Sequence, residues 1–90
     1  MGHADQEQQL LRKLCVSLAD DARGFTAESA GASGVLILNN GHYRGVWHWM
    51  DGNYAFTPGG YGNSTHSAPT PQDAVSFTLN HVCRQQVAAS

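Results

Sequence analysis

The chain has 90 residues, a formal net charge of −2 and only 13% charged side chains, about half the usual share. This length predicts one small domain over residues 1–90 with a modest core. The five Lys and Arg residues are scattered, so the basic cluster that binds a phosphate backbone is missing and we expect no nucleic-acid partner. No apolar run is long enough to cross a membrane and no signal peptide opens the chain, so we expect a cytoplasmic protein without a membrane partner.

The first predicted element is a helix over about residues 5–23. Asp5 suits the N-cap, because this position favours a short polar side chain. Gly24 suits the C-terminal end, because that position favours a residue without Cβ. The expected buried stripe of this helix consists of Leu11, Leu14, Leu18, Ala22 and Phe25, with Leu10 and Cys15 at its edges. Residues 26–33 are small and polar and predict a connector.

Three strands are predicted next, over about residues 34–39, 42–50 and 53–57. The first is rich in β-branched residues and uncharged, as is typical of a buried strand. Asn40-Gly41 and Asp51-Gly52 separate the three segments, and both dipeptides favour two-residue hairpin turns. We therefore expect a three-stranded antiparallel meander.

Two-residue turns also predict the register of this meander. The expected pairs are Asn39 with His42, Leu38 with Tyr43, Leu36 with Gly45, Trp49 with Tyr54, and Trp47 with Phe56. Because paired residues share a face, one face collects the aromatic residues and is assigned to the core: Leu36, Leu38, Tyr43, Gly45, Trp47, Trp49, Tyr54 and Phe56. The opposite face carries Val35, Ile37, His42, Arg44, Val46, His48, Met50, Asn53, Ala55 and Thr57.

A glycine-rich connector over residues 58–69 leads to a second helix, predicted over about residues 71–86. Thr70 is the expected N-cap of this helix and Pro71 its first residue. Phe77 lies off the apolar stripe, where it either covers the connector or contributes to a dimer contact. The predicted fold class is α+β, a three-stranded meander packed on one face by two helices in the order αβββα.

This order resembles the topology of double-stranded-RNA-binding domains. Those domains place a basic cluster at the start of the last helix, whereas this chain has Thr70-Pro71-Gln72-Asp73 there, so we do not expect RNA binding of that type. The run from Gly52 to Pro58 and the run from Thr70 to Val75 are similar to a pattern of HicB-type antitoxin domains, and also to small phage proteins of α-β-α sandwich type. The resemblance implies a phage or mobile-element origin and carries over no functional residues.

The face of the sheet without helices is the candidate working surface. Polar groups on it alternate with more apolar residues than a solvated face needs, which favours an interface, although a solvated outer face stays the alternative. The glycine-rich connector adds an aromatic contact residue, because long loops often carry function. The candidate partner-binding residues are His42, Arg44, His48, Met50, Asn53 and Tyr61.

Catalytic and metal sites are not expected. His42 and His48 are six residues apart on one strand, or roughly 20 Å, too far to share a metal ion. Cys15 lies in the middle of a helix, whereas catalytic thiols favour a helix N-terminus, so we expect it to be a half-buried, free thiol like Cys83. The connector lacks a phosphate-binding glycine motif, and we expect no cofactor.

Three functional hypotheses follow. The first is a non-enzymatic protein-binding module, for instance a phage-encoded inhibitor of a bacterial defence or regulatory protein, that uses the open sheet face and the glycine-rich connector. The second is an antitoxin-like domain or one that sequesters a small ligand. The third is a small enzyme that uses Cys15 or the histidines. The apolar part of the open face also predicts a homodimer, and dimer interface and target-binding surface remain alternatives for that face.

Overall fold

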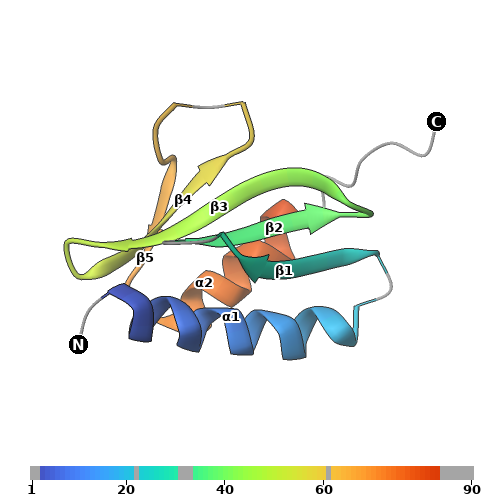
Figure 1. The fold of residues 1–90 in the computed structure, drawn as a ribbon, viewed down its shortest axis with the longest axis horizontal. Helices are drawn as coiled ribbons and strands as arrows, with labels where there is room; N and C mark the ends of the chain where they lie inside the picture. The colour runs from blue at the N-terminus through green and yellow to red at the C-terminus, as the bar shows by residue number, and fades with distance from the viewer. Residues whose placement is uncertain (1–2, 22, 31–33, 61, 84–90) are drawn as a thin grey trace.

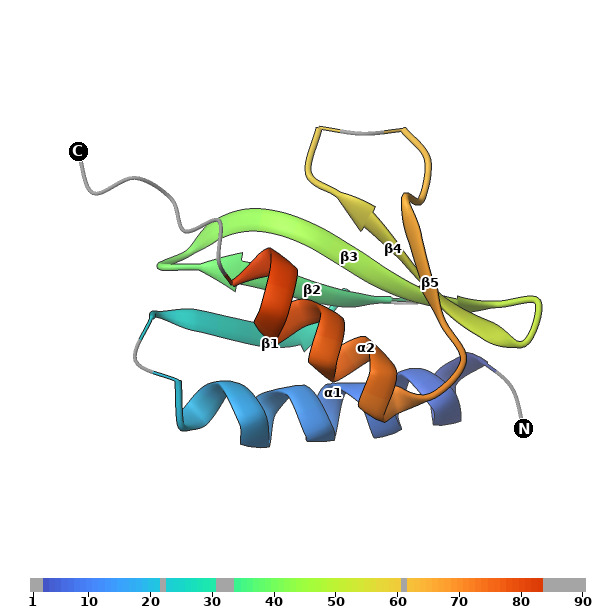
Figure 2. The ribbon, with the colours of Figure 1, turned by 180° about the vertical axis from the view of Figure 1, so that it is seen from behind.

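The computed structural model describes residues 3–21, 23–30, 34–60 and 62–83 (Figure 1). In chain order the elements are α1 (His3–Ala19), β1 (Phe25–Ser29), β2 (Val35–Asn39), β3 (His42–Met50), β4 (Asn53–Pro58), β5 (His66–Ala68), α2 (Pro71–Phe77) and the π-helical turn η1 (Thr78–Val82). The strands form one antiparallel sheet in the order β1-β2-β3-β4-β5. Both helices lie on the same face of the sheet (Figures 1 and 2).

The α+β class, the antiparallel meander and the two helices are confirmed, but the prediction of only three strands is wrong. The segment assigned to a connector contains β1, which pairs with β2 along its whole length. Phe25 begins this strand and is buried, so it packs as a strand residue and not on the helix stripe. The short strand β5 likewise lies inside the connector predicted over residues 58–69, where it pairs with β4. Neither strand has the run of alternating apolar residues that identifies a strand from sequence.

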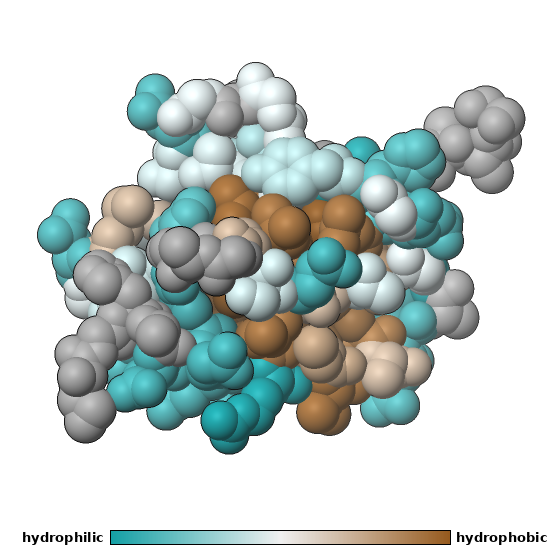
Figure 3. Space-filling view, viewed as in Figure 1, coloured by the Kyte–Doolittle hydropathy of each residue, from teal (hydrophilic) through white to brown (hydrophobic). Residues whose placement is uncertain are grey.

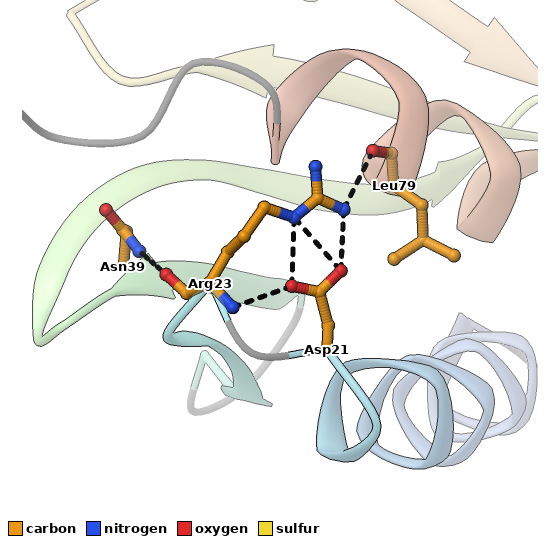
Figure 4. Close-up of polar contacts among 4 residues, drawn as sticks. All are labelled: Asp21, Arg23, Asn39 and Leu79. Atoms are coloured by element: carbon orange, nitrogen blue, oxygen red, sulfur yellow. Dashed lines mark hydrogen bonds and ion pairs between the residues drawn. The ribbon is translucent and has the colours of Figure 1, made fainter.

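The first helix ends at Ala19, several residues before the predicted end. Asp21 and Arg23 then form a close pair in which the guanidinium donates to both carboxylate oxygens, with Nη2 at 2.6 Å from Oδ2 (Figure 4). The same guanidinium lies 3.4 Å from the carbonyl oxygen of Leu79, and the side-chain amide of Asn39 donates to the carbonyl oxygen of Arg23 at 2.9 Å. This connection therefore ties α1 to the end of β2 and to η1.

Replacing Asp21 with asparagine is expected to weaken the pH dependence of the free energy of unfolding in the acid range. The pKa of Asp21 is lowered from 3.8 to about 2, because the side chain and then the backbone N–H of Arg23 donate hydrogen bonds to the carboxylate. A lowered pKa means that the ion pair stabilises the fold fully above pH 4 and loses this contribution as the pH falls through about 2. Urea unfolding of both proteins at neutral and acid pH should show a stability difference that shrinks toward pH 2.

Asp20→Asn is the control for that measurement. Asp20 is exposed and forms no ion pair within the described part of the chain. An equal effect of the two substitutions would contradict the role assigned to Asp21.

Both predicted hairpin turns are confirmed. Asn40 and Gly41 have φ of 52° and 86°, and Asp51 and Gly52 have φ of 52° and 79°, so each turn has two successive residues in the left-handed region. Asparagine, aspartate and glycine tolerate that region best, which is why these dipeptides favour the turn. The pairs next to the turns also form as predicted: Asn39 with His42, Leu38 with Tyr43, Trp49 with Tyr54, and Trp47 with Phe56.

The predicted pair of Leu36 with Gly45 is wrong, and the correct register reverses the two faces of β2. The register shifts between Ile37 and Leu38, so that Ile37 pairs with Gly45 and Arg44 is an extra residue on β3. This β-bulge places Val35 and Ile37 in the core, at 1% and 0% exposure, and puts Leu36 and Leu38 on the opposite face. Tyr43, also assigned to the core, is 48% exposed. A bulge shifts the pairing by one residue, and such a shift turns every following side chain to the other face.

Gly45 stands where the Phe56 ring needs space. A Cβ at this position would overlap the Cζ atom of Phe56, so the ring occupies the volume that a side chain at residue 45 would fill. A glycine in the interior of a strand often marks a bulge or a close approach of this kind. Phe56 packs against Trp47 with ring centroids 5.0 Å apart, which places both rings in the core beneath the sheet.

The core lies between the sheet and the helices. Its α1 residues are Leu10, Leu14 and Leu18, so the buried stripe is centred one residue earlier than predicted and Leu11 is only partly buried. The Nε1 atom of Trp47 donates to the hydroxyl of Thr78 at 3.0 Å, and that hydroxyl donates to the carbonyl of Ala74 at 2.8 Å. The sheet is therefore joined to the second helix by a buried hydrogen-bond chain.

The second helix begins as predicted. The hydroxyl of Thr70 accepts from the backbone N–H of Asp73 at 3.1 Å, and Pro71 is the first helical residue. After Phe77 the helix widens into the π-turn η1, where the N–H of Cys83 donates to the carbonyl of Thr78. The Thr78 hydroxyl bonds back to the preceding turn, and a threonine in this arrangement often distorts a helix. The predicted end near residue 86 lies outside the described residues.

Candidate functional site

The face of the sheet opposite the helices is uncovered in the described part of the chain and carries a central apolar row. Leu36, Leu38 and Val46 are half-buried there, and Ala55 lies beside them. Figure 3 shows hydrophobic atoms gathered over β2 and β3, the strands that carry the first three. We call these four residues the open-face row. Thr26, Glu28, His48 and Thr57 share the face by their register and surround the row with polar groups.

The bulge gives this row a different composition from the one predicted from the sequence. The predicted open face has Val35 and Ile37 on β2, whereas the structure places Leu36 and Leu38 there. The exchange replaces a valine and an isoleucine by two leucines, and the open face stays apolar at its centre. An apolar centre with a polar rim is the usual anatomy of a protein interface.

The predicted partner-binding residues divide between several places. His48 lies on the open face beside Gly34 and pairs with Ala55, and Met50 follows it at the end of β3 with 48% exposure. Asn53 begins β4, and its amide nitrogen lies 3.4 Å from the carbonyl oxygen of Asp51, so it stabilises its own turn. His42 is exposed beside the first turn, at the other end of β3. Tyr61 lies outside the described residues.

Arg44 does not join His48. As the extra residue of the bulge it lines a groove of about 450 Å³ between the end of the β3–β4 ladder and η1. The other lining residues are Tyr43, Phe56, Pro58, Gly59, Thr65, Phe77, His81 and Val82. This groove is not predicted from the sequence, although Gly45 inside a strand is a signal that could have indicated the bulge.

Aromatic rings stack along one wall of this groove. The Phe77 ring lies between two imidazoles, with its centroid 3.8 Å from that of His66 and 4.8 Å from that of His81. It also packs edge-on against the ring of Trp47, with the two ring centroids 5.9 Å apart. Phe77 therefore covers the strand that ends the glycine-rich connector, which is the first of the two roles considered for it.

The cysteines differ from each other. Cys15 is exposed, against the expectation of a half-buried thiol, because the stripe of Leu10, Leu14 and Leu18 leaves the neighbouring position outside the core. Its Sγ atom lies 3.5 Å from the carbonyl oxygen of Ala27 and donates to it. Cys83 is fully buried, and burial raises the pKa of its thiol to about 11, so this thiol is protonated at neutral pH. A protonated thiol is a poor nucleophile and a poor metal ligand.

Within the ranges that the structure covers, no three His, Cys, Asp or Glu side chains come together as a metal site. Nor is any helix in those ranges long and apolar enough to span a membrane. Comparison of the chain with protein-family models, with curated proteins and with solved structures found no match in any of the three. The resemblance to HicB-type and small phage proteins stays a prediction from the sequence.

Proposed function

We propose that this chain is a non-enzymatic protein-binding domain that docks its partner on the open face of its sheet. The observation that carries the proposal is the open-face row, three half-buried aliphatic side chains and Ala55 on a face that neither helix covers. Both helices lie against the opposite face, so the row contributes nothing to the core between sheet and helices.

The physical support is the gain from covering this row. Removing apolar surface from water stabilises a complex by roughly 25 cal/mol per Å². Leu36, Leu38 and Val46 are still partly exposed, and covering their exposed parts adds on the order of 1 kcal/mol for each side chain. Standard interfaces bury about 800 Å² on each partner and combine an apolar centre with a polar rim, and the open face has both parts. Only 13% of the residues are charged, so electrostatic repulsion between this surface and an approaching protein is weak.

Two occupants compete for this face. The first is a different protein, and the resemblance to small phage proteins points to a bacterial defence or regulatory protein. The second is another copy of the chain, which would join two sheets face to face as a homodimer. Sedimentation velocity at tens of micromolar distinguishes them, because the second predicts twice the mass of 9.7 kDa without any other protein.

The experiment compares charged substitutions on the two sides of the molecule. Leu36→Lys and Val46→Lys place a cation in the open-face row, whereas Val16→Lys makes the same kind of change on α1, where Val16 is 69% exposed. The wild-type protein is first produced in cells and purified together with the protein that it captures there. Each purified variant is then tested for binding to that captured protein. A charge that is desolvated without a partner is costly, so each open-face variant should bind at least about ten-fold more weakly.

The control and the contradicting outcome follow from the same comparison. Val16→Lys should bind like the wild type, and unchanged near-ultraviolet circular dichroism should show that all variants keep the tryptophan packing. Loss of binding in Val16→Lys, with full binding in both open-face variants, would move the interface to the helix side and contradict the proposal.

A further inference from the structure

The groove beside the β-bulge carries a chemistry that the open face lacks. Arg44 is half-buried, and its Nε atom is shielded from solvent with no hydrogen-bond partner in the described residues. A buried donor without an acceptor is unfavourable. A turn of the side chain toward an acceptor in the groove would relieve that cost. The guanidinium also has no ion pair with any described carboxylate, although Arg23 elsewhere in the fold has one.

The charge of the groove favours an anion. None of the described residues that line it is acidic, while Arg44 and His81 supply N–H donors and Tyr43 and Thr65 supply hydroxyl groups. Arginine binds carboxylates and phosphates with two parallel hydrogen bonds, which fixes the orientation of the anion as well as its charge. The overall charge of −2 gives no general attraction for anions, so any preference must come from this local arrangement.

The walls of the groove favour a flat ligand. Four of the lining residues have planar rings: Tyr43, Phe56, Phe77 and His81. His81 is the exposed end of the His66-Phe77-His81 stack. The π-turn η1 carries His81 and Val82 to this wall, and single π-turns are frequent at functional sites. A volume of about 450 Å³ lies within the range of small-molecule pockets.

We infer that this groove binds a small planar aromatic anion, with Arg44 holding the negative group and His81 stacking on the ring. This site is separate from the protein-binding face proposed above. It does not depend on that proposal, because Arg44 and the open-face row lie at different places in the fold.

Isothermal titration of the 90-residue chain with 2-naphthoate tests the inference. Two matched probes separate its parts: 2-naphthamide keeps the rings without the charge, and cyclohexanecarboxylate keeps the charge without a planar ring. We expect saturable binding of 2-naphthoate, with each of the other probes at least about ten-fold weaker. No binding of 2-naphthoate, or equal binding of either other probe, would overturn the inference.

Substitutions then assign the binding to the groove. Arg44→Gln should weaken 2-naphthoate binding at least about ten-fold, and Arg44→Lys should give an intermediate loss because it keeps the charge without the planar fork. His81→Ala should also weaken binding, and it decides the question if Arg44→Gln does not fold. Arg12→Gln, an exposed residue of α1, and Leu36→Lys on the open face should leave binding unchanged. Unchanged binding in the Arg44 and His81 variants would contradict the site.

Discussion

Replacing Glu7 with alanine is expected to destabilise the fold by about 2–4 kcal/mol. Glu7 is only 7% exposed, and its two carboxylate oxygens accept from two backbone N–H groups: Gly34 at 2.7 Å and Trp49 at 3.0 Å. Strand β2 begins at Val35, so the carboxylate takes the place of a neighbouring strand for these two donors. Without it they lose strong, charge-assisted acceptors in a place that water reaches poorly. Urea unfolding followed by tryptophan fluorescence measures the loss.

Two further variants show whether the carboxylate itself is responsible. Glu7→Gln keeps the shape but offers one acceptor oxygen in place of two, so it should lose roughly half as much stability as Glu7→Ala. Glu28→Ala removes an exposed carboxylate from β1 and should change stability by less than about 0.5 kcal/mol. Similar losses for Glu7→Ala and Glu28→Ala would contradict the bridging role of Glu7.

Trp47→Ala is expected to destabilise the fold by about 3–5 kcal/mol. Trp47 is fully buried, lies against Phe56 and Phe77, and donates its indole N–H to Thr78. Its removal opens a large cavity between sheet and second helix and also leaves the Thr78 hydroxyl without its buried donor. A domain of this size has a total stability of about 5–13 kcal/mol, so this single change consumes a large part of it.

Trp49 provides a matched control on the same strand. It packs at the edge of the core and is only partly buried. Its ring centroid lies 4.7 Å from that of Tyr54. Trp49→Ala should therefore cost clearly less than Trp47→Ala in the same urea titration. Equal losses at the two positions would show that the core is not centred where the structure places it.

The parts of the fold that depend on neighbouring residues are predictable from sequence. Asn40-Gly41 and Asp51-Gly52 determine their turns through their own backbone preferences, and Thr70 and Pro71 begin a helix in the same way. The strands joined by these turns follow directly. This is why β3 has the predicted bounds and β4 differs by a single residue at its end.

The parts that depend on distant contacts are not predictable in this way. The bulge at Arg44 accommodates the Phe56 ring over Gly45, a contact between two strands. The bulge also changes the candidate site. Leu36 and Leu38 lie on the face opposite to the predicted one, and Arg44 lies away from His48 instead of beside it. Strand β1 forms because β2 offers it an edge, and the polar sequence of β1 does not reveal this. An open face opposite the helices was therefore predictable, but its composition was not.

The central claim is that the uncovered face of the sheet is the surface that binds a protein. Carbene footprinting of the free protein and of its complex with the captured partner tests this claim most directly. The account predicts reduced labelling of Leu36, Leu38 and Val46 in the complex, with Val16 on α1 labelled as in the free protein. Protection of Val16 and the outer surfaces of the helices, with unchanged labelling of the three open-face residues, would contradict it.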